Sequence, residues 1–280
     1  MCLISYCIPT FNSAQYLKQC ICSIHAQGIK DYEIIVSDNA STDQTRQVID
    51  ELKAPKLKYF CNDSNIGPHR NFDRAISLSS GKYIKTLCAD DVLIAGVVQK
   101  QLEVFDKYKD VAVVSCDHIV TDEYLKPITV CREAAGYWCG IDITKLCFES
   151  LNNHTGGPSN CLYLAGELKC RRFDGSFSYL SDLKINLELL KTHDFFGLGE
   201  PGYYYRRHSQ SDTELNNPPV ARAENWARLV LEFNVFAAKS YKQLLRSHLP
   251  YNLRVALKKE LRKNHFMRTL ISKIFKAVRG

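Results

Sequence analysis

Long hydrophobic runs and a leader-like start are both missing from this sequence of 280 residues. Its longest apolar stretch, at residues 92–98, is far shorter than the ~20 residues that a helix needs to cross a bilayer. Residues 1–10 contain no basic segment followed by an apolar segment and a cleavage site, which a secretory signal peptide would have. We therefore expect a cytoplasmic protein that neither spans a membrane nor is exported.

Spacing motifs based on cysteine and glycine are missing as well. The 12 cysteines include no Cys-x-x-Cys pair, and a long chain without an export signal favours reduced thiols over a disulfide scaffold or a structural zinc site. The sequence has neither the Gly-x-Gly-x-x-Gly loop of dinucleotide-binding folds nor a P-loop motif. These absences argue against a dehydrogenase and a P-loop enzyme, so a metal would have to hold any nucleotide phosphates.

Positive and negative charge are unevenly divided along the chain. Residues 221–280 hold 14 Lys and Arg against 3 Asp and Glu, a net charge of +11, whereas residues 1–220 carry a net charge of −4. An acidic body suits metal-assisted chemistry, and cations with apolar residues at helical spacing over 239–279 suit an anionic membrane surface. A packing helix with a solvated basic face is the alternative. Nucleic acid is not expected, because no zinc finger, helix-turn-helix or stacking motif accompanies the charge.

Two periodicities alternate over the first 120 residues. Apolar runs of strand length are separated by stretches with helical spacing, which predicts an α/β fold with a Rossmann-like, mostly parallel sheet and helices on both faces. The expected strands lie at residues 3–8, 32–37, 57–60, 83–87 and 111–116. The expected helices begin after Ser13, after Asp43 and after Gly67-Pro68, with a fourth over 94–107.

The alternation ends after residue 120. Loops rich in Gly, Asn and Pro are expected at 136–140, 152–160 and 197–208, with a strand at 161–165, a helix over 179–191 and a short strand at 203–206. From residue 219 the pattern is helical and basic, and the pair Pro218-Pro219 is the natural boundary. We therefore divide the chain into 1–118 and 119–217, two halves of one domain, and a basic helical C-terminal region, 218–280.

Polar residues follow the ends of the expected parallel strands, where ligands bind in folds of this class. Residues 9–12 follow the first strand, Asp38 the second, and Asp90 and Asp91 the fourth. Adjacent carboxylates at a strand end repel one another unless a cation, hydrogen bonds or solvent offset the charge, so this pair suggests Mg²⁺ or Mn²⁺. Turn and helix-capping roles are the alternative for all three aspartates.

Four segments, in this order along the chain, resemble the family 2 glycosyltransferases of the GT-A fold: CIPTFNSAQYLKQCICSI, YEIIVSDNASTDQT, NIGPHRNFDRAISLSSGKYIKTLCADD and YLSDLKINLELL. The resemblance implies an inverting, metal-dependent transfer of a sugar from a nucleotide-sugar, with UDP-sugars favoured. The acceptor would be a hydroxyl of a cell-surface glycan or lipid-linked molecule, as in polysaccharide or lipopolysaccharide synthesis on the inner face of the membrane. The resemblance gives donor binding to residues 1–118 and acceptor binding to 119–217.

The same resemblance assigns roles to single residues on the donor side. Asp38 would accept a hydrogen bond from the nucleotide base. Asp90 and Asp91 match the end of the family's Asp-x-Asp motif, whose first acidic position is Cys88 here. For Arg70, a solvated charge on a helix face is the alternative. The residues implied to bind the nucleotide are Pro9, Thr10, Asn12, Asp38, Arg70, Asp90 and Arg206.

In the acceptor half, the resemblance points to Asp182 as the catalytic base, although the Glu that often precedes it is Ser181 here. A carboxylate there would take the proton of the acceptor hydroxyl while the metal stabilises the departing diphosphate. A first-turn residue favoured by the helix dipole is the alternative for Asp182. The segment YYYRRHSQSDT resembles the family's closing segment and makes His208 a metal ligand beside Asp90 and Asp91, although a basic surface turn would look the same.

Two other classes of protein stay open. A nucleotidylyltransferase also combines an α/β sheet with acidic metal ligands, but it usually has a Gly-rich loop after the first strand, which PTFNSAQYLK lacks. A non-catalytic sugar-nucleotide-binding protein would explain why Cys88 and Ser181 stand where acidic residues are common in the family.

Overall fold

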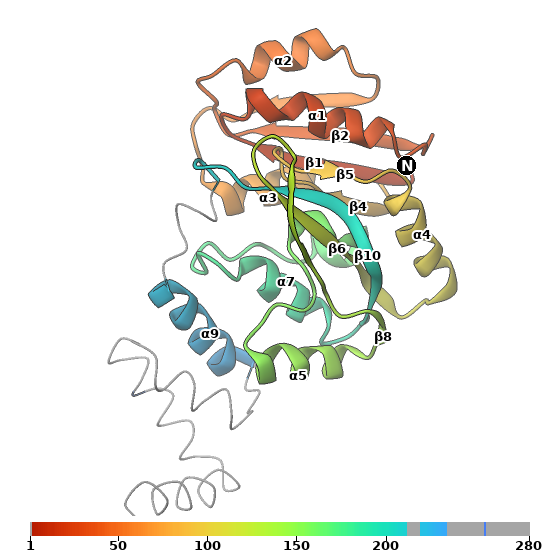
Figure 1. The fold of residues 1–280 in the computed structure, drawn as a ribbon, viewed down its shortest axis with the longest axis vertical. Helices are drawn as coiled ribbons and strands as arrows, with labels where there is room; N and C mark the ends of the chain where they lie inside the picture. Colours follow the sequence, from red (N-terminus) through yellow and green to blue (C-terminus); the bar gives the residue numbers. More distant parts are fainter. Residues whose placement is uncertain (1, 212–218, 234–254, 256–280) are drawn as a thin grey trace, which may run out of the picture.

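A computed structural model describes residues 2–211, 219–233 and 255 (Figure 1). Ten strands of the described chain form one twisted sheet, and eight of them follow one another across it. In sheet order these are β3 (Leu57–Cys61), β2 (Tyr32–Asp38), β1 (Ile4–Thr10), β4 (Tyr83–Thr86), β9 (Leu162–Leu164), β6 (Val111–Thr121), β10 (Asp194–Arg206) and β5 (Val92–Leu93). Of the other two, β7 (Pro127–Cys131) pairs with β6, and β8 (Gly136–Trp138) pairs with β10.

The predicted α/β class is confirmed, and the sheet has a parallel half and a mixed half. Strands β3, β2, β1 and β4 are all parallel, as their helical connections require. Strand β9 lies between β4 and β6 and is antiparallel to both, while β6 and β10 are parallel to each other. Only residues 122–126 connect β6 to β7, too few for a crossover, so this pair is an antiparallel hairpin.

Helices cover both faces of the sheet, because successive side chains of each buried strand point to opposite sides. In β1, Tyr6 and Ile8 pack with Leu17 in one core, whereas Cys7 packs with Ile76 in the other. The first core includes residues of α1 (Ala14–His25), α2 (Thr45–Leu52) and α4 (Val97–Lys107). The second includes residues of α3 (Pro68–Leu78), α5 (Gly140–Ser150), α6 (Ala165–Lys169) and α7 (Ser181–Leu189).

A third core joins the C-terminal helix to the body. Helix α9 (Pro219–Phe233) begins at the expected boundary and lies beside α5 and α7 (Figure 1). Its Trp226 and Leu229 pack with Phe148 of α5 and Leu187 of α7. The remaining basic region, where we expect an amphipathic membrane-binding helix over 239–279, lies outside the described residues except for position 255. In the part of the chain that the structure describes, no helix is both long and apolar enough to cross a membrane.

Two segments that we expected to be loops are largely strand. Residues 136–140 contain β8, and residues 197–202 join the strand predicted at 203–206 in the second part of β10, which has register shifts on either side of Pro201. The glycines there mark close backbone approach: a Cβ added to Gly197 would lie 1.7 Å from the Ala134 carbonyl oxygen. Glycine inside a strand often signals such contact or a bulge, so composition alone misled the loop prediction.

Candidate active site

A cavity of about 950 Å³ opens at the carboxyl ends of the parallel strands. The strand register brings these ends together, since Thr10 at the end of β1 pairs with Asp38 at the end of β2. Five of the predicted nucleotide- and metal-binding residues line the cavity, namely Pro9, Thr10, Asn12, Asp90 and His208, and so does Cys88. The structure therefore gathers segments that lie about 200 positions apart in the chain at one edge of the sheet.

Two hydroxyl groups in the cavity lining lack a partner. Thr10 Oγ1 and Ser211 Oγ are buried and make no hydrogen bond with the described part of the chain. A buried polar group without a partner costs free energy unless water or a ligand satisfies it. Asn12, by contrast, has a partner: its Oδ1 accepts a hydrogen bond of 2.8 Å from the Thr42 N–H, which connects the end of β1 to the turn after β2.

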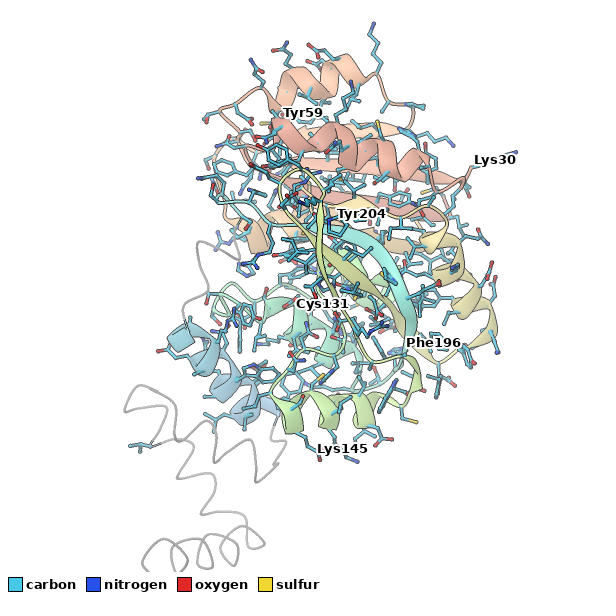
Figure 2. The ribbon with its side chains drawn as sticks, viewed as in Figure 1. Lys30, Tyr59, Cys131, Lys145, Phe196 and Tyr204 are labelled. Atoms are coloured by element: carbon cyan, nitrogen blue, oxygen red, sulfur yellow. The ribbon has the colours of Figure 1, made fainter. Side chains whose placement is uncertain are left out.

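Asp38 is fully enclosed by its own neighbours. Its Oδ1 accepts hydrogen bonds from the N–H and the hydroxyl of Ser41, at 3.0 and 2.5 Å. Its Oδ2 accepts one of 2.5 Å from the hydroxyl of Tyr59, labelled in Figure 2. The cavity is lined by the adjacent Asn39 and not by Asp38. In this structure Asp38 thus orders the turn after β2, and its predicted contact with a nucleotide base stays a prediction.

Asp90 and His208 form the polar end of the cavity. The His208 Nε2 lies 3.1 Å from Asp90 Oδ2, and its imidazole packs on the ring of Tyr16 with 4.7 Å between centroids. Asp91 is buried, and its Oδ1 accepts a hydrogen bond of 3.2 Å from the backbone N–H of Arg206. Burial, and secondly the charge of Asp90, raise the pKa of Asp91 well above its ordinary value.

These donors fit a divalent cation. A thiol sulfur of Cys88 and carboxylate oxygens of Asp90 and Asp91 all lie within 4.8 Å of one another, and His208 adds an imidazole next to Asp90. Two adjacent carboxyl groups, one of them raised in pKa by burial and by the other, form an excess of negative charge that a cation would offset. The carboxylate ligands suit Mn²⁺ or Mg²⁺, whereas the imidazole and the thiol are softer ligands than the oxygen usual there.

The two predicted arginines have different surroundings. The buried Arg206 guanidinium is fully engaged: Nε donates to the Asp90 carbonyl at 2.8 Å, and Nη2 donates to Gln19 Oε1 at 2.6 Å. It also lies over the Tyr16 ring, 4.6 Å from the centroid. Arg206 therefore fixes Asp90 and Tyr16 and does not line the cavity. Arg70 is exposed on α3 and is also absent from the lining, as expected for a solvated charge.

The segment 156–160 links this cavity to the second carboxyl centre. The Cys88 N–H donates to Ser159 Oγ at 3.0 Å, and the Thr86 hydroxyl donates to the Pro158 carbonyl at 2.7 Å. At its other end, a Cβ added to Gly157 would lie 3.5 Å from Asp182 Oδ2. This glycine-rich stretch thus connects the end of β4 to the start of α7.

Asp182 stands in the first turn of α7 and is half-buried. Burial raises its pKa to about 6, although backbone N–H groups of the helix start oppose the shift. The side-chain contact to Asp182 in the described chain is weak, with Asn153 Nδ2 3.5 Å from its Oδ2. A carboxylate with an elevated pKa and few donors of its own is suited to accept a proton.

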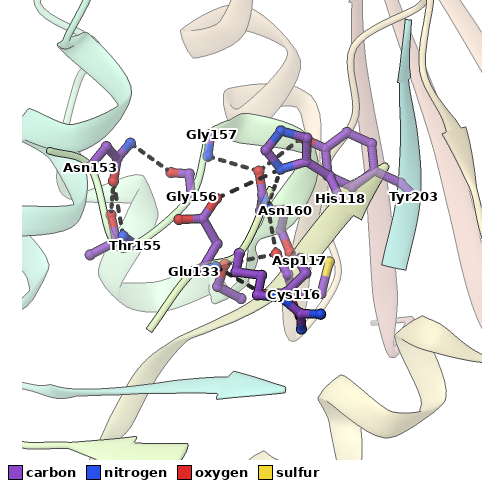
Figure 3. Close-up of polar contacts among 12 residues, drawn as sticks. Cys116, Asp117, His118, Glu133, Asn153, Thr155, Gly156, Gly157, Asn160 and Tyr203 are labelled. Atoms are coloured by element: carbon purple, nitrogen blue, oxygen red, sulfur yellow. Dashed lines mark hydrogen bonds and ion pairs between the residues drawn. The ribbon is translucent and has the colours of Figure 1, made fainter. Parts of the chain in front are cut away.

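Several polar residues near these centres have no counterpart among our predictions. Glu133 and His118 lie close to Asn160 of the 156–160 segment (Figure 3), and Tyr16 and Ser211 line the cavity. Tyr16 and Ser211 lie inside the segments that carry the family resemblance, so those motifs were the available signal. Glu133 belongs to no motif, and sequence alone offered nothing to single it out.

Comparison with known proteins identifies the family of this chain. Residues 5–164 match the family model described as Glycosyl transferase family 2. The abequosyltransferase RfbV of Salmonella typhimurium is 34% identical over 198 residues, which cover 69% of this chain and 55% of that protein. A GalNAc(5)-diNAcBac-PP-undecaprenol beta-1,3-glucosyltransferase of Campylobacter jejuni is 36% identical over 103 residues, covering 36% of this chain and 33% of that protein. The chain thus spans about half or less of the length of these curated relatives.

Solved structures share the fold. TarS of S. aureus in complex with UDP-GlcNAc superposes with a TM-score of 0.67 at 16% identity, covering 92% of this chain and 71% of that one. The mannosyltransferase PcManGT of Pyrobaculum calidifontis, in complex with GDP-Man and Mn²⁺, gives a TM-score of 0.58 at 12% identity, covering 99% and 80%. The expected GT-A fold is confirmed by these likenesses. Because the family model matches more than half of its residues, the chain belongs to glycosyl transferase family 2.

Proposed function

We propose that this protein is a metal-dependent glycosyltransferase that moves a sugar, with inversion, from a nucleotide-sugar to an acceptor hydroxyl. One observation carries the proposal. A cavity at the strand ends holds a cation-binding donor set at Asp90 and His208, and the 156–160 segment connects it to a separate carboxyl, Asp182, that has a raised pKa. Donor binding and proton removal need such a pair of neighbouring but distinct centres.

The donor site is built from residues 1–118, and closing residues come from the end of β10. Thr10 and Ser211 offer hydroxyl groups that have no partner in the described chain, and Asn39 and Asn12 also line the cavity. We assign the nucleoside to this part, with a UDP-sugar favoured. Asp90 and His208, with Asp91 and Cys88 beside them, would hold Mn²⁺ or Mg²⁺. When bound, that cation supplies positive charge for the diphosphate leaving group.

The acceptor site is built from residues 119–217. Asp182 Oδ2 takes the proton of the attacking hydroxyl as the new glycosidic bond forms at the anomeric carbon and the bond to the nucleoside diphosphate breaks. With a pKa of about 6, the carboxylate is ionised at pH 7 and still basic enough to accept a proton. Single displacement of this kind inverts the anomeric configuration.

The names of the relatives support a proposal for the acceptor. RfbV is named as an abequosyltransferase, and the name of the Campylobacter jejuni glucosyltransferase includes a glycan on PP-undecaprenol. We propose a cell-surface glycan or a lipid-linked precursor as the acceptor here. The net charge of +11 over residues 221–280 supports a place on the anionic inner face of the membrane.

A non-catalytic sugar-nucleotide-binding protein is the second candidate. Two observations favour it: Cys88 replaces an acidic residue at the cation site, and the Arg206 guanidinium is already committed to the backbone of Asp90 and to Gln19. Such a protein would bind a nucleotide-sugar but release no nucleoside diphosphate from it.

A thermal-shift panel followed by a turnover assay tests the proposal. UDP-, GDP-, CDP- and dTDP-sugars are compared with and without Mn²⁺, since a ligand at 100 times its dissociation constant adds about 2.7 kcal/mol of stability. The stabilising donor is then incubated with simple p-nitrophenyl hexosides, and release of the nucleoside diphosphate is measured. Asp90→Asn should remove the Mn²⁺-dependent shift, whereas Asp106→Asn on the exposed face of α4 should not. Donor binding without any release would favour the second candidate.

A further inference from the structure

Lys85 of β4 has no access to solvent, which is rare for a lysine without a charged partner. Its neighbours in the sheet are Tyr6 of β1 and Leu162 of β9. Its Nζ donates hydrogen bonds to Gln101 Oε1 and to the Asn160 carbonyl oxygen, both at 3.2 Å, and both of these partners are neutral. Burial lowers the pKa of this lysine, as expected for an ammonium group away from water. Lys85 therefore lowers stability relative to an apolar side chain at the same place.

The Asn160 carbonyl oxygen is the point at which Lys85 meets the 156–160 segment. Besides Lys85, Gln101 Nε2 donates to this oxygen at 2.8 Å and the Cys116 thiol donates to it at 3.3 Å. The donors stand on β4, α4 and β6, so three separate elements hold one carbonyl group. Because Lys85 and Gln101 also bond to each other, these two side chains and the Asn160 carbonyl form a closed triangle. All three residues have an exposed fraction of 0%.

The Asn160 side chain binds the segment as well. Its Oδ1 accepts hydrogen bonds from the Gly157 N–H and from the Tyr203 hydroxyl of β10, both at 2.8 Å (Figure 3). Its Nδ2 donates to the Cys116 carbonyl at 2.5 Å. A buried amide whose donor and acceptor are both used is restricted to one orientation. We refer to Lys85, Gln101, Asn160 and Tyr203 as the Asn160 cluster.

The 156–160 segment extends from the Asn160 cluster to both centres of the proposed site. Ser159, next to Asn160 in the chain, accepts a hydrogen bond of 3.0 Å at its Oγ from the N–H of Cys88, one of the donors of the cation site. Gly157 packs beside Asp182, because a Cβ added to this glycine would lie in ordinary van der Waals contact with Asp182 Oδ2, at 3.5 Å. A shift of this segment would therefore move the backbone at both centres.

We propose that Lys85 is a positioning residue for sugar transfer: through the Asn160 cluster it fixes the 156–160 segment, and with it the placement of the cation site relative to Asp182. The inference rests on the proposed function, in which these are the donor centre and the base. Attack on the anomeric carbon needs the base and the leaving group in a defined arrangement, and a displacement of about 1 Å can cost about 100-fold in rate. Lys85 touches no reacting atom, and no proton moves to or from it.

Lys85→Met separates a positioning role from a structural one, because methionine keeps the length of the side chain but neither donates nor carries charge. The probes are p-nitrophenyl hexosides and whichever UDP-, GDP-, CDP- or dTDP-sugar stabilises the wild type. We expect kcat to fall by about tenfold to 100-fold, with the donor dissociation constant within a factor of about two. Stability to urea should stay constant or rise, since an apolar residue replaces a buried ammonium. Lys107→Met, at the exposed end of α4, is the matched control and should change neither quantity.

Tyr203→Phe tests the cluster with the loss of a single hydroxyl group, which the fold should tolerate. It removes one of the two hydrogen bonds to Asn160 Oδ1, so kcat should fall by about threefold to tenfold, the range of one typical hydrogen bond. Combined with Lys85→Met, its effect should be smaller than in the wild type, because both changes act on Asn160. Fully additive effects, or a kcat of Lys85→Met that falls only as far as its stability does, would overturn the positioning role.

Hydrogen–deuterium exchange observes the segment without any turnover. The Gly157 N–H is bonded to Asn160 Oδ1, so Lys85→Met should raise the exchange rate of this amide by about tenfold, while the amides of β2 keep their rates. An unchanged rate at Gly157 together with a lower kcat would show that the loss does not pass through the segment, and the inference would be wrong.

The wild type separates this inference from the proposed function. If the wild type releases nucleoside diphosphate with a hexoside and Lys85→Met does so with an unchanged kcat, Lys85 is not a positioning residue and the glycosyltransferase stands. If the wild type binds donor but transfers to no hexoside and releases no nucleoside diphosphate, the proposed function falls, and the role of Lys85 falls with it.

Discussion

Glu33 of the donor half and Glu133 of the acceptor half are two buried carboxyl groups with opposite surroundings. In the donor half, burial alone would raise the pKa of Glu33, but hydrogen bonds from Lys58, Ser5 and Ser80 outweigh it and lower the pKa to about 2. Asp43 of the same half is exposed, and its pKa is also lowered, because hydrogen bonds, first from the Thr45 hydroxyl, outweigh its partial desolvation. In the acceptor half, the buried Glu133 and the half-buried Asp182 have few donors, and burial first raises their pKa values to about 8 and about 6.

This difference separates carboxyl groups that hold the fold together from those available for chemistry. A carboxylate saturated by protein donors stabilises the loops it bridges, and its lone pairs are already used. A buried carboxyl without donors lowers stability at neutral pH, and such a cost is typical of groups that meet a substrate. The contrast predicts opposite effects on stability when single carboxyl groups of the two halves are replaced by amides.

The largest effect should come from removing the proton acceptor. Asp182→Asn keeps the shape of the side chain but cannot take a proton, so kcat should fall by about 100- to 10,000-fold. Donor affinity should stay near the wild-type value, because Asp182 does not line the donor cavity. Turnover with the p-nitrophenyl hexosides measures the loss, and Asp106→Asn is the control. Transfer within a factor of about three of the wild type would remove Asp182 as the base.

The next effect concerns stability in the acceptor half. Glu133 holds a proton in the folded state up to about pH 8, whereas an unfolded chain loses it near pH 4.3, so folding is penalised as the pH rises between these values. Glu133→Gln removes this penalty and should raise the free energy of unfolding by up to about 4 kcal/mol at pH 8, with no gain at pH 4. Urea unfolding at both pH values checks the prediction. An equal gain at pH 4 would mean that the effect is not titration of Glu133.

The donor half should respond in the opposite direction. The pKa of Glu33 is about 2 in the folded state and near 4.3 in an unfolded chain, so its stabilisation is present above pH 4.3 and is lost as the pH falls toward 2. Glu33→Gln should therefore lower the free energy of unfolding by about 3 kcal/mol at pH 7. The deficit should shrink as urea unfolding is repeated at lower pH. A deficit that is constant with pH would place the loss in packing instead of in the hydrogen-bonded charge.

The sequence predicted the donor half well because its elements are local. Short windows of sequence contain the apolar runs of β1, β2, β3, β4 and β6 and the helical spacing of α1. The parallel half of the sheet was therefore predictable. The helix α4 was expected from residue 94 and begins at Val97, after the short strand β5. The acceptor half was harder, since β10 carries Gly and Pro residues at contacts that only the folded sheet reveals.

The candidate site was predictable in its residues but not in their surroundings. Asp90 and His208 came from motifs, and the structure places them 3.1 Å apart. Sequence could not show that the Arg206 guanidinium already has hydrogen-bond partners within the chain, because its partner Gln19 lies 187 positions away. Nor could it indicate Glu133, whose pKa is raised first by burial in the folded chain and then by the charges of Asp117 and Asp182, residues of two other elements.

The smallest expected effect tests whether the acceptor approaches Asp182 past Gly157. Gly157 has a φ of −84°, a backbone conformation that alanine adopts without strain, so Gly157→Ala should leave stability unchanged or slightly improved. Its new methyl group would lie in ordinary contact with Asp182 Oδ2, at 3.5 Å, beside the carboxylate that the acceptor hydroxyl has to reach. KM for the p-nitrophenyl hexosides should then rise by about threefold to tenfold, an effect comparable to one misplaced methylene, while donor binding stays constant.

Gly166→Ala is the matched control, because a Cβ there meets nothing within 4 Å. If Gly157→Ala leaves both KM and kcat unchanged, the acceptor does not approach Asp182 past Gly157, and the contrast between the two halves would reflect stability alone.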